Sequence, residues 1–402
     1  MARVLFVWEL GGGMGHIARA TPIIDGLLDA GHDVFVALRD LSRATQLLHR
    51  VSEVRLLQCP LWLAEPKGLP AAATYAELMF RFGFGEPVGL EGLTRAWREL
   101  FRLVNPDLLL ADHAPNALLA ARGQPFKRAL LGNGFFSPPR VSPLPLFRTW
   151  ENIAPVRIAS ADAHALATSN KVLAHLGAPP LARLCDLFDV DEDFLCTWPE
   201  LDHYGGREHQ RYWGPATERK RGIAPAWPEG SGPCVFVYIK AELQTREPII
   251  AALKFLEVRA LLYVPGLGAQ KRSEHESNAM HFAVEPVRIG EAMAHADVLI
   301  CTAGEGTIAA ALLAGVPVLA IPMHAEQYLT ALNIHRAGVG LAAQPQVPEA
   351  QLITLIGALL NEPKFRNSAR AFAARHADFD TDTANAQIVA RCEELLAAAD
   401  TG

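Results

Sequence analysis

The sequence predicts an α/β fold built from two doubly wound domains. Short runs of β-branched and other apolar residues alternate with longer segments in which apolar residues recur at helical spacing. This alternation is typical of parallel strands joined by crossover helices. It loosens in a stretch rich in proline and glycine and then restarts, which indicates a second domain of the same design. The length of 402 residues leaves room for two or three domains of about 150 residues.

The composition excludes several classes of protein. Half of the residues are hydrophobic and a fifth are charged, which is the balance of a soluble globular chain. A formal net charge of -6 without a basic stripe argues against a nucleic-acid binder. No apolar run approaches the ~18 residues that a membrane-spanning helix needs. Because the six cysteines are scattered without a C-x-x-C pair, we expect no disulfide framework, no structural zinc site and a cytoplasmic location.

Five strands are expected in the first half of the chain. The clearest helical patterns between them cover residues 17–30 and 116–122. The expected strands are Val4–Trp8, Asp33–Leu38, Val54–Leu57, Asp107–Ala111 and Arg128–Leu131.

One long segment, residues 59–104, interrupts this pattern. It lies between two consecutive strands and is rich in aromatic residues. Long insertions at the carboxyl edge of such a sheet often line a ligand cleft, and aromatic residues there would suit an apolar or aromatic ligand. The alternative, which the sequence favours about equally, is a pair of helices that cover one face of the sheet.

Residues 214–232 are the best candidate for a domain linker, because proline and glycine gather there and the alternation restarts directly afterwards. The first domain is therefore expected over residues 1–213 and the second over 233–380. The new strands are expected at Cys234–Ile239, Ala260–Val264, Met280–Val284, Val298–Cys301 and Val318–Ile321. Residues 381–402 predict a final amphipathic helix, Thr381–Ala399, long enough to cross back to the first domain.

A glycine-rich turn follows the first expected strand and opens a helix, with the sequence Gly11-Gly12-Gly13-Met14-Gly15-His16. Glycine permits close backbone approach and positive φ, and the free N–H groups of a helix start attract anions. Gly13 and Gly15 are therefore candidates for a turn against a bound substrate. The spacing differs from the G-x-G-x-x-G dinucleotide fingerprint, which makes a nicotinamide enzyme the weaker interpretation. A purely structural turn is the other alternative.

His16 and Asp112 are the candidate catalytic residues. His16 is expected in the first turn of that helix, where it could accept a proton from a substrate. Asp112 ends the fourth expected strand at the same sheet edge, and a carboxylate there could fix the tautomer of the imidazole and stabilise its charged form. The alternative is that each residue only caps a helix.

The most specific stretch lies in the second half of the chain. The strand Val298–Cys301 leads into Thr302-Ala303-Gly304-Glu305-Gly306-Thr307, then a helix, then Gly315-Val316-Pro317 and Pro322-Met323-His324-Ala325-Glu326-Gln327. The amides from Gly304 to Thr307, including Gly306, would face a phosphate at the helix start, with the Thr302 and Thr307 hydroxyls as further donors. Glu326 and Gln327, expected at the end of the next strand, suit sugar hydroxyls. Lys240, after the first strand of the second domain, could pair with a phosphate.

Together these motifs resemble the nucleotide-sugar glycosyltransferases of the GT-B fold, particularly family 1, with some similarity to the peptidoglycan N-acetylglucosaminyltransferases. Gly15-His16 is similar to the family's G-H turn, whose His is the acceptor-activating base, and Asp107–Asp112 to the segment whose second Asp supports it. The donor box of the family matches in order and spacing at Gly304, Gly306, Thr307, Gly315, Val316, Pro317, Pro322, Gln327, Gly338 and Gly340. The resemblance covers both halves of the chain and implies two Rossmann-like domains facing a central cleft.

The donor box departs from the family pattern at four positions. The donor-box His is replaced by Thr302 and the ribose-binding Glu by Ala310, while Glu305 adds negative charge where the diphosphate is expected and Glu326 replaces an Asp. The losses at Thr302 and Ala310 motivate an alternative, a catalytically degenerate protein that binds a ligand or a partner. A sugar-nucleotide 2-epimerase of the same fold is a third possibility.

The resemblance thus implies an inverting glycosyltransferase. It would move a sugar from a nucleoside diphosphate of the UDP or TDP type to a hydroxyl of a small apolar or lipid-linked acceptor. His16, supported by Asp112, would take the proton of that hydroxyl, and the helix start near Gly304 would stabilise the leaving diphosphate. This scheme requires no metal and no other cofactor, because the helix terminus supplies the positive field.

Overall fold

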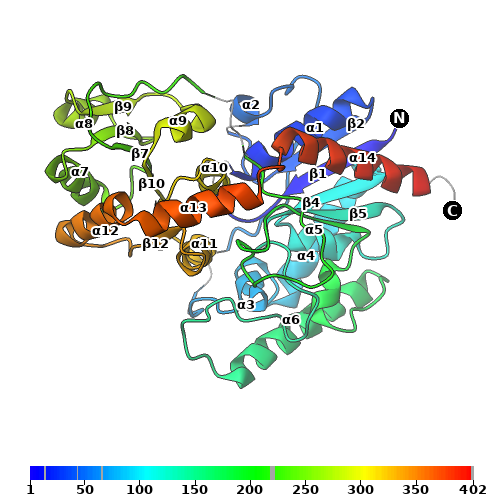
Figure 1. Ribbon diagram of the computed structural model, residues 1–402. Helices are drawn as coiled ribbons and strands as arrows, with labels where there is room; N and C mark the ends of the chain where they lie inside the picture. Colours follow the sequence, from blue (N-terminus) through cyan, green and yellow to red (C-terminus); the bar gives the residue numbers. More distant parts are fainter. Residues whose placement is uncertain (13–14, 43, 65–66, 218–221, 400–402) are drawn as a thin grey trace. The chain divides into compact units, whose positions relative to one another are not determined.

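The computed structural model describes residues 1–12, 15–42, 44–64, 67–217 and 222–399 (Figure 1). The candidate turn residue Gly13 lies outside this range. The chain divides into two compact units, of which unit 1 comprises Met1–Gly214 with Thr381–Gly402 and unit 2 comprises Pro215–Asp380. Each unit holds a six-stranded sheet, and the predicted α/β class with two doubly wound, Rossmann-like domains is confirmed.

The sheet of unit 1 has the strand order β3-β2-β1-β4-β5-β6, and every neighbouring pair is parallel. Ligands of open α/β sheets bind outside the carboxyl ends of the strands where the order reverses, which in this sheet is between β1 and β4. The strands are β1 Arg3–Trp8, β2 Asp33–Leu38, β3 Arg55–Gln58, β4 Leu108–Asp112, β5 Lys127–Gly132 and β6 Glu192–Leu195.

Helices cover both faces of this sheet, because successive side chains of a strand point to opposite faces. Leu5 and Val7 of β1 join a core cluster with α4 and α5, whereas Val4, Phe6 and Trp8 join a second cluster with α1 and α14. The helices are α1 Gly15–Asp29, α2 Ala44–Leu47, α3 Tyr75–Met79, α4 Pro87–Val104, α5 Pro115–Ala121, α6 Pro155–His175 and α14 Thr381–Ala399, with 3-10 turns η1 Phe80–Phe82 and η2 Leu184–Phe188.

The long segment between β3 and β4 contains the helices α3 and α4. The side chains of Phe84, Trp97 and Phe101 are buried in the core cluster on one face of the sheet. The alternative of helices covering a sheet face therefore describes this segment. Because these three aromatic side chains are part of the core, they are not evidence that the acceptor is apolar.

Unit 2 repeats the arrangement of unit 1. Its sheet has the order β12-β11-β10-β7-β8-β9, so the order reverses between β10 and β7. Its strands are β7 Cys234–Tyr238, β8 Arg259–Tyr263, β9 Met280–Ala283, β10 Val298–Cys301, β11 Val318–Ala320 and β12 Gly340–Ala342. Its helices are α7 Arg246–Phe255, α8 Ala269–His275, α9 Ile289–His295, α10 Glu305–Leu313, α11 Ala325–Arg336, α12 Glu349–Asn361 and α13 Pro363–Arg375.

The last helix, α14, belongs to unit 1 and packs beside α1 (Figure 1). Ile388, Cys392 and Leu395 of α14 are buried in the same cluster as the inner face of α1. The contact is close, since a Cβ atom on Gly26 would stand 2.8 Å from Cγ2 of Val389. Unit 1 is therefore completed by the end of the chain. Among the helices described, none is long and apolar enough to cross a membrane.

Candidate active site

His16 and Asp112 meet at the carboxyl edge of the unit 1 sheet, beside its switch point. His16 lies in the first turn of α1, and Asp112 is the last residue of β4. His16 Nδ1 and Asp112 Oδ2 are 2.9 Å apart, although the residues are 96 positions apart in the sequence. Both side chains are buried, with exposed fractions of 7% and 1%. Because the carboxylate accepts the Nδ1–H bond, the imidazole keeps Nε2 as its basic nitrogen.

Two aromatic rings hold the imidazole of His16 in place. The indole of Trp8 stacks on it with 5.0 Å between ring centroids, and the ring of Phe136 lies 4.8 Å away. The indole is itself fixed, because Trp8 Nε1 donates to the carbonyl of Leu10 at 2.6 Å. On the carboxylate side, Arg19 Nη1 lies 3.6 Å from Asp112 Oδ2. These contacts restrict rotation of the imidazole and give Nε2 a defined direction.

Gly11 is the glycine on which this geometry depends. Its φ of +84° is in the left-handed region, and a Cβ atom there would stand 2.9 Å from Nε2 of His16. Gly15, by contrast, opens α1 with no atom within 4 Å of its Cβ position. Sequence reasoning selected Gly13 and Gly15 and missed Gly11, which stood out only as one of the glycines in the turn after β1.

Glu9 caps helix α5, which removes the alternative that Asp112 serves as its cap. Its carboxyl accepts hydrogen bonds from the backbone N–H groups of Asn116 at 3.1 Å and Ala117 at 3.3 Å and from Nδ2 of Asn116. Burial raises the pKa of Glu9 from 4.5 to about 8, and these hydrogen bonds offset only part of the shift. No pattern in the sequence predicted this buried acid.

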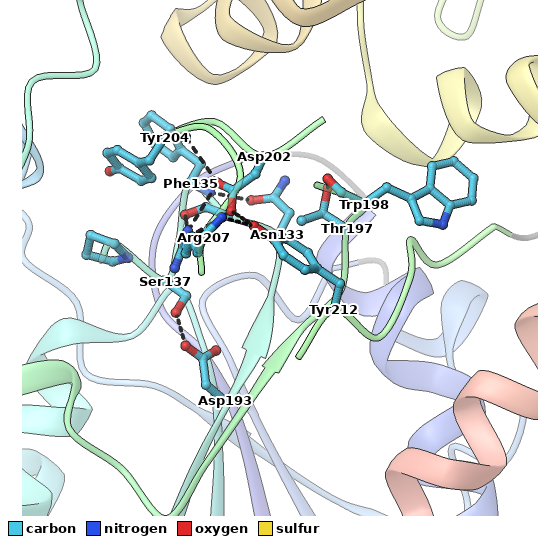
Figure 2. A network of polar contacts seen from close by, with 12 residues as sticks. Asn133, Phe135, Ser137, Asp193, Thr197, Trp198, Asp202, Tyr204, Arg207 and Tyr212 are labelled. Atoms are coloured by element: carbon cyan, nitrogen blue, oxygen red, sulfur yellow. Dashed lines mark hydrogen bonds and ion pairs between the residues drawn. The ribbon is translucent and has the colours of Figure 1, made fainter. Parts of the chain in front are cut away.

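A polar network anchors the loop that carries Phe136 (Figure 2). Arg207 Nε lies 2.8 Å from Asp202 Oδ2, and Arg207 Nη2 donates to the carbonyl of Gly134 at 3.2 Å. The hydroxyl of Tyr212 donates to Asp202 Oδ2 at 2.9 Å. Gly134 leaves no room for a side chain, because a Cβ atom there would stand 2.4 Å from Asp202 Oδ1.

The far end of the same loop is tied to β6. Ser137 Oγ donates to Asp193 Oδ2 at 2.6 Å, and Arg140 Nη2 donates to the same oxygen at 3.2 Å (Figure 2 shows the first bond). Burial raises the pKa of Asp193, and the Arg140 charge opposes that shift. The loop is thus fixed at both ends, with Phe136 against His16.

The candidate donor-binding residues lie at the switch point of unit 2. Thr302 follows β10, Gly304 is the N-cap of α10, and Lys240 follows the neighbouring strand β7 with its side chain exposed. Nothing lies within 4 Å of a Cβ position on Gly304, so the start of α10 is open beside it. Ala303 has a φ of +61°, a left-handed turn that the sequence did not predict. The N–H groups of such a helix start suit an anion such as phosphate.

The first turn of α10 contains Glu305, Gly306 and Thr307. A Cβ atom on Gly306 would stand 2.8 Å from the carbonyl oxygen of Ala216, so close packing requires this glycine whether or not a ligand is bound. Glu305 is 7% exposed and places a carboxyl group in the same turn. Thr307 follows and is half-buried.

Glu326 and Gln327 lie in the first turn of α11, not at the end of a strand as expected, since β11 already ends at Ala320. Gln327 Oε1 accepts a hydrogen bond from the backbone N–H of Met323 at 2.8 Å and closes the turn before the helix. Its amide nitrogen is therefore the end of the side chain that could reach a ligand. Within the described part of the chain, no cluster of three His, Cys, Asp or Glu residues could hold a metal ion.

Residues 268–383 match the glycosyltransferase family 28 C-terminal domain. Over nearly its whole length the chain also resembles solved glycosyltransferases. The calicheamicin glycosyltransferase CalG4 aligns with a TM-score of 0.73 at 16% identity and 98% coverage of both chains. The glycosyltransferase VinC in complex with DTDP aligns with a TM-score of 0.68 at 15% identity and 100% coverage of both. The chain has the GT-B fold.

A curated relative of this GT-B chain is the PGL/p-HBAD biosynthesis rhamnosyltransferase of Mycobacterium bovis (strain BCG / Pasteur 1173P2). The two are 27% identical over 296 residues, which cover 68% of this chain and 64% of the relative. The chain therefore spans slightly less than two thirds of the relative's length. The family 28 match includes the donor-side residues from Thr302 to Gln327, whereas Lys240 and the His16–Asp112 pair lie outside it.

Proposed function

We propose that this protein is an inverting glycosyltransferase that transfers a sugar from a nucleoside diphosphate to an acceptor hydroxyl. The observation that carries the proposal is the hydrogen bond between His16 and Asp112 at the switch point of unit 1. The family 28 domain in unit 2 supports it, because it contains the candidate donor site.

In the proposed reaction His16 is the general base. Its Nε2 takes the proton of the acceptor hydroxyl as that oxygen forms a bond to the anomeric carbon of the donor. The bond from this carbon to the diphosphate breaks on the opposite face, and the diphosphate leaves with the electron pair. Asp112 stabilises the imidazolium that forms on His16.

On the donor side, the proposed diphosphate site is the start of α10. Its N–H groups and helix dipole stabilise the charge that develops on the leaving group, with the hydroxyls of Thr302 and Thr307 as further donors. Lys240, Glu326 and Gln327 are proposed to complete the nucleotide-sugar site. We propose a TDP sugar, because VinC is a glycosyltransferase solved with DTDP and the curated relative is named a rhamnosyltransferase.

The first test is thermal unfolding and calorimetry with TDP, UDP, GDP and their common sugar conjugates. A ligand at about 100 times its Kd raises the free energy of unfolding by ~2.7 kcal/mol, which is visible as a higher midpoint. We expect TDP and its sugars to give the largest shift. A flat response at millimolar ligand would contradict the donor site and favour the degenerate binding protein that Ala310 and Thr302 suggest.

The second test is turnover of the donor with an acceptor panel, in the natural protein and in His16→Ala. We expect the substitution to lower kcat by about 10²- to 10⁴-fold and to leave the Kd of TDP unchanged. Unchanged turnover would remove His16 from the mechanism. NMR of the product establishes inversion at the anomeric carbon, and conversion of the donor alone would identify a 2-epimerase instead.

A further inference from the structure

Beside the dyad, several buried polar atoms have no hydrogen-bond partner within the described residues. They are the hydroxyl of Tyr75, Oδ1 of Asp112, both ring nitrogens of His113 and Oδ1 of Asn116. Buried polar groups are almost always paired, and an unpaired one costs free energy. A group of them next to a candidate reaction centre therefore calls for a partner that the free chain does not supply.

One of these atoms, Nδ1 of His113, lies near His16, the candidate base. The residue follows Asp112 at the end of β4, has a left-handed φ of +47° and is 5% exposed. Its carbonyl accepts the N–H of Leu10 at 3.0 Å, which fixes the turn. His113 Nδ1 and His16 Nε2 lie 3.1 and 2.9 Å from the Cβ position of Gly11. The two imidazole nitrogens thus converge on the same glycine.

Tyr75 is a second ring neighbour of His113. Its ring centroid is 5.8 Å from that of His113, and its side chain is fully buried. Apolar rings surround the pair, since Phe136 stacks on His113 at 4.3 Å and Phe188 meets Tyr75 edge-on at 5.3 Å. Burial holds the pKa of His113 well below its usual range and that of Tyr75 well above. Both groups are therefore uncharged near pH 7, and each can donate and accept a hydrogen bond.

We propose that His113 and Tyr75 form a subsite for the acceptor, in which they hydrogen-bond oxygen atoms next to the reacting hydroxyl. Uncharged polar groups set among aromatic rings suit a ring that carries several neighbouring hydroxyls, such as a sugar unit or a polyphenol. An acceptor with a single hydroxyl on an apolar scaffold would leave the His113 ring and the Tyr75 hydroxyl unpaired, so the subsite disfavours such an acceptor. This inference rests on the proposed function, because it takes His16 Nε2 as the atom that meets the acceptor.

Tyr75→Phe tests the subsite with little change in shape, because it removes only the unpaired hydroxyl. We expect an equal or higher unfolding midpoint, an unchanged Kd for TDP and a KM for the acceptor raised about tenfold or more. Tyr212→Phe is the matched control for the unfolding midpoint. Its hydroxyl bonds Asp202 and the N–H of Arg207, so its loss lowers the midpoint. A lower midpoint with unchanged acceptor KM in Tyr75→Phe would mean that the cluster holds buried water only.

Binding of simple probes tests the substrate class without any turnover. Calorimetry with TDP present compares methyl α-mannoside with cyclohexanol, and catechol with phenol. We expect the compound with several hydroxyls to bind about tenfold tighter in each pair, and the ratio to fall towards one in Tyr75→Phe and in His113→Asn, since Asn tolerates the left-handed turn but is shorter.

The same measurement on His16→Ala separates this inference from the proposed function. If the preference for several hydroxyls persists there while no transfer activity is found in the natural protein, the subsite stands and the proposed reaction fails. The subsite is overturned if transfer depends on His16 but the natural protein binds the probes with several hydroxyls no more tightly than the others. It is also overturned if both Tyr75→Phe and His113→Asn keep the preference for several hydroxyls. Absence of binding by all four probes also overturns it.

Discussion

At the scale of single residues, Asp112 determines which nitrogen of His16 carries the proton. Asp112→Asn keeps the size of the side chain but can donate to Nδ1, which moves the imidazole proton to Nε2 and removes the basic nitrogen. We expect kcat to fall by about 10²- to 10⁴-fold, with the unfolding midpoint and the Kd of TDP close to those of the natural protein. Steady-state kinetics with calorimetry checks this. Near-normal turnover would show that the carboxylate charge is not needed.

Glu9 makes stability depend on pH. In the folded chain its pKa is about 8 rather than 4.5, so between these values the folded protein keeps a proton that the unfolded chain has lost. The stabilisation is therefore complete below pH 4.5 and is lost as the pH rises towards 8, with a slope of at most ~1.4 kcal/mol per pH unit. Glu9→Gln has no such proton, so its stability relative to the natural protein should rise across this window. Urea unfolding at pH 5 to 8 measures the difference, and a constant difference would contradict the pKa of Glu9.

Part of the site could be predicted from single residues. The G-H turn and the strand-final aspartate pointed to His16 and Asp112, because both features place a residue at the carboxyl edge of a parallel sheet. Glu9 and His113 could not be identified from the sequence. Both are buried, and their surroundings are made by residues distant in the sequence. Gly11 was visible only as one glycine among several, and its contact with His16 becomes specific only in the fold.

At the scale of elements, the loop after β5 links a buried ion pair to the orientation of His16. Gly134→Ala would place a Cβ atom 2.4 Å from Asp202 Oδ1, so the loop or the Asp202–Arg207 pair must move. We expect a loss of about 1–3 kcal/mol in the free energy of unfolding, together with a lower kcat as Phe136 shifts from His16. Denaturant unfolding and kinetics measure both effects.

Gly92→Ala is the matched control for this loop variant. Gly92 lies within α4, is exposed and has no atom within 4 Å of its Cβ position. The substitution should stabilise the protein by roughly 0.5–1 kcal/mol and leave kcat unchanged. Equal kcat in Gly134→Ala and Gly92→Ala would show that the loop does not act on His16.

The two strands that the sequence did not predict were the weakest ones. β6 Glu192–Leu195 begins with two acidic residues, and β12 Gly340–Ala342 has three residues that include Gly and Ala, so neither forms an apolar β-branched run. Their place is set by pairing with β5 and β11, which a local pattern does not reveal. By contrast, α14 was predicted to its exact ends, since its composition and helical spacing are continuous.

At the scale of the whole molecule, α14 holds unit 1 together from the far end of the chain. Gly26→Ala would place a Cβ atom 2.8 Å from Val389 and force α14 away from α1. We expect a loss of about 1–3 kcal/mol in the stability of unit 1, with partial recovery in the double variant Gly26→Ala/Val389→Ala, which removes the colliding methyl groups. Calorimetric unfolding checks this. If the losses in unfolding free energy of the two single variants simply add in the double variant, the Gly26–Val389 contact is contradicted.

The two-domain α/β organisation was predictable because strand and helix patterns alternate throughout the chain. The repeated strand order of the two sheets was not, because local periodicity does not determine which strands are neighbours. The order emerges from the fold, and it is what gives the candidate residues their common location. In unit 1, His16 follows β1 and Asp112 ends β4, on either side of the reversal. In unit 2, Lys240 and Thr302 follow β7 and β10 in the same way, whereas Glu326 and Gln327 follow β11.

The return of α14 to unit 1 also affects the order in which the chain can fold during synthesis. Unit 2 is continuous, residues 215–380, and can be completed as soon as those residues have left the ribosome. Residues 1–214 of unit 1 are made before unit 2 but lack α14 until residues 381–399 emerge, so the face of α1 around Gly26 stays uncovered in the nascent chain. We therefore expect the unit that is synthesised first to be the one that finishes folding last.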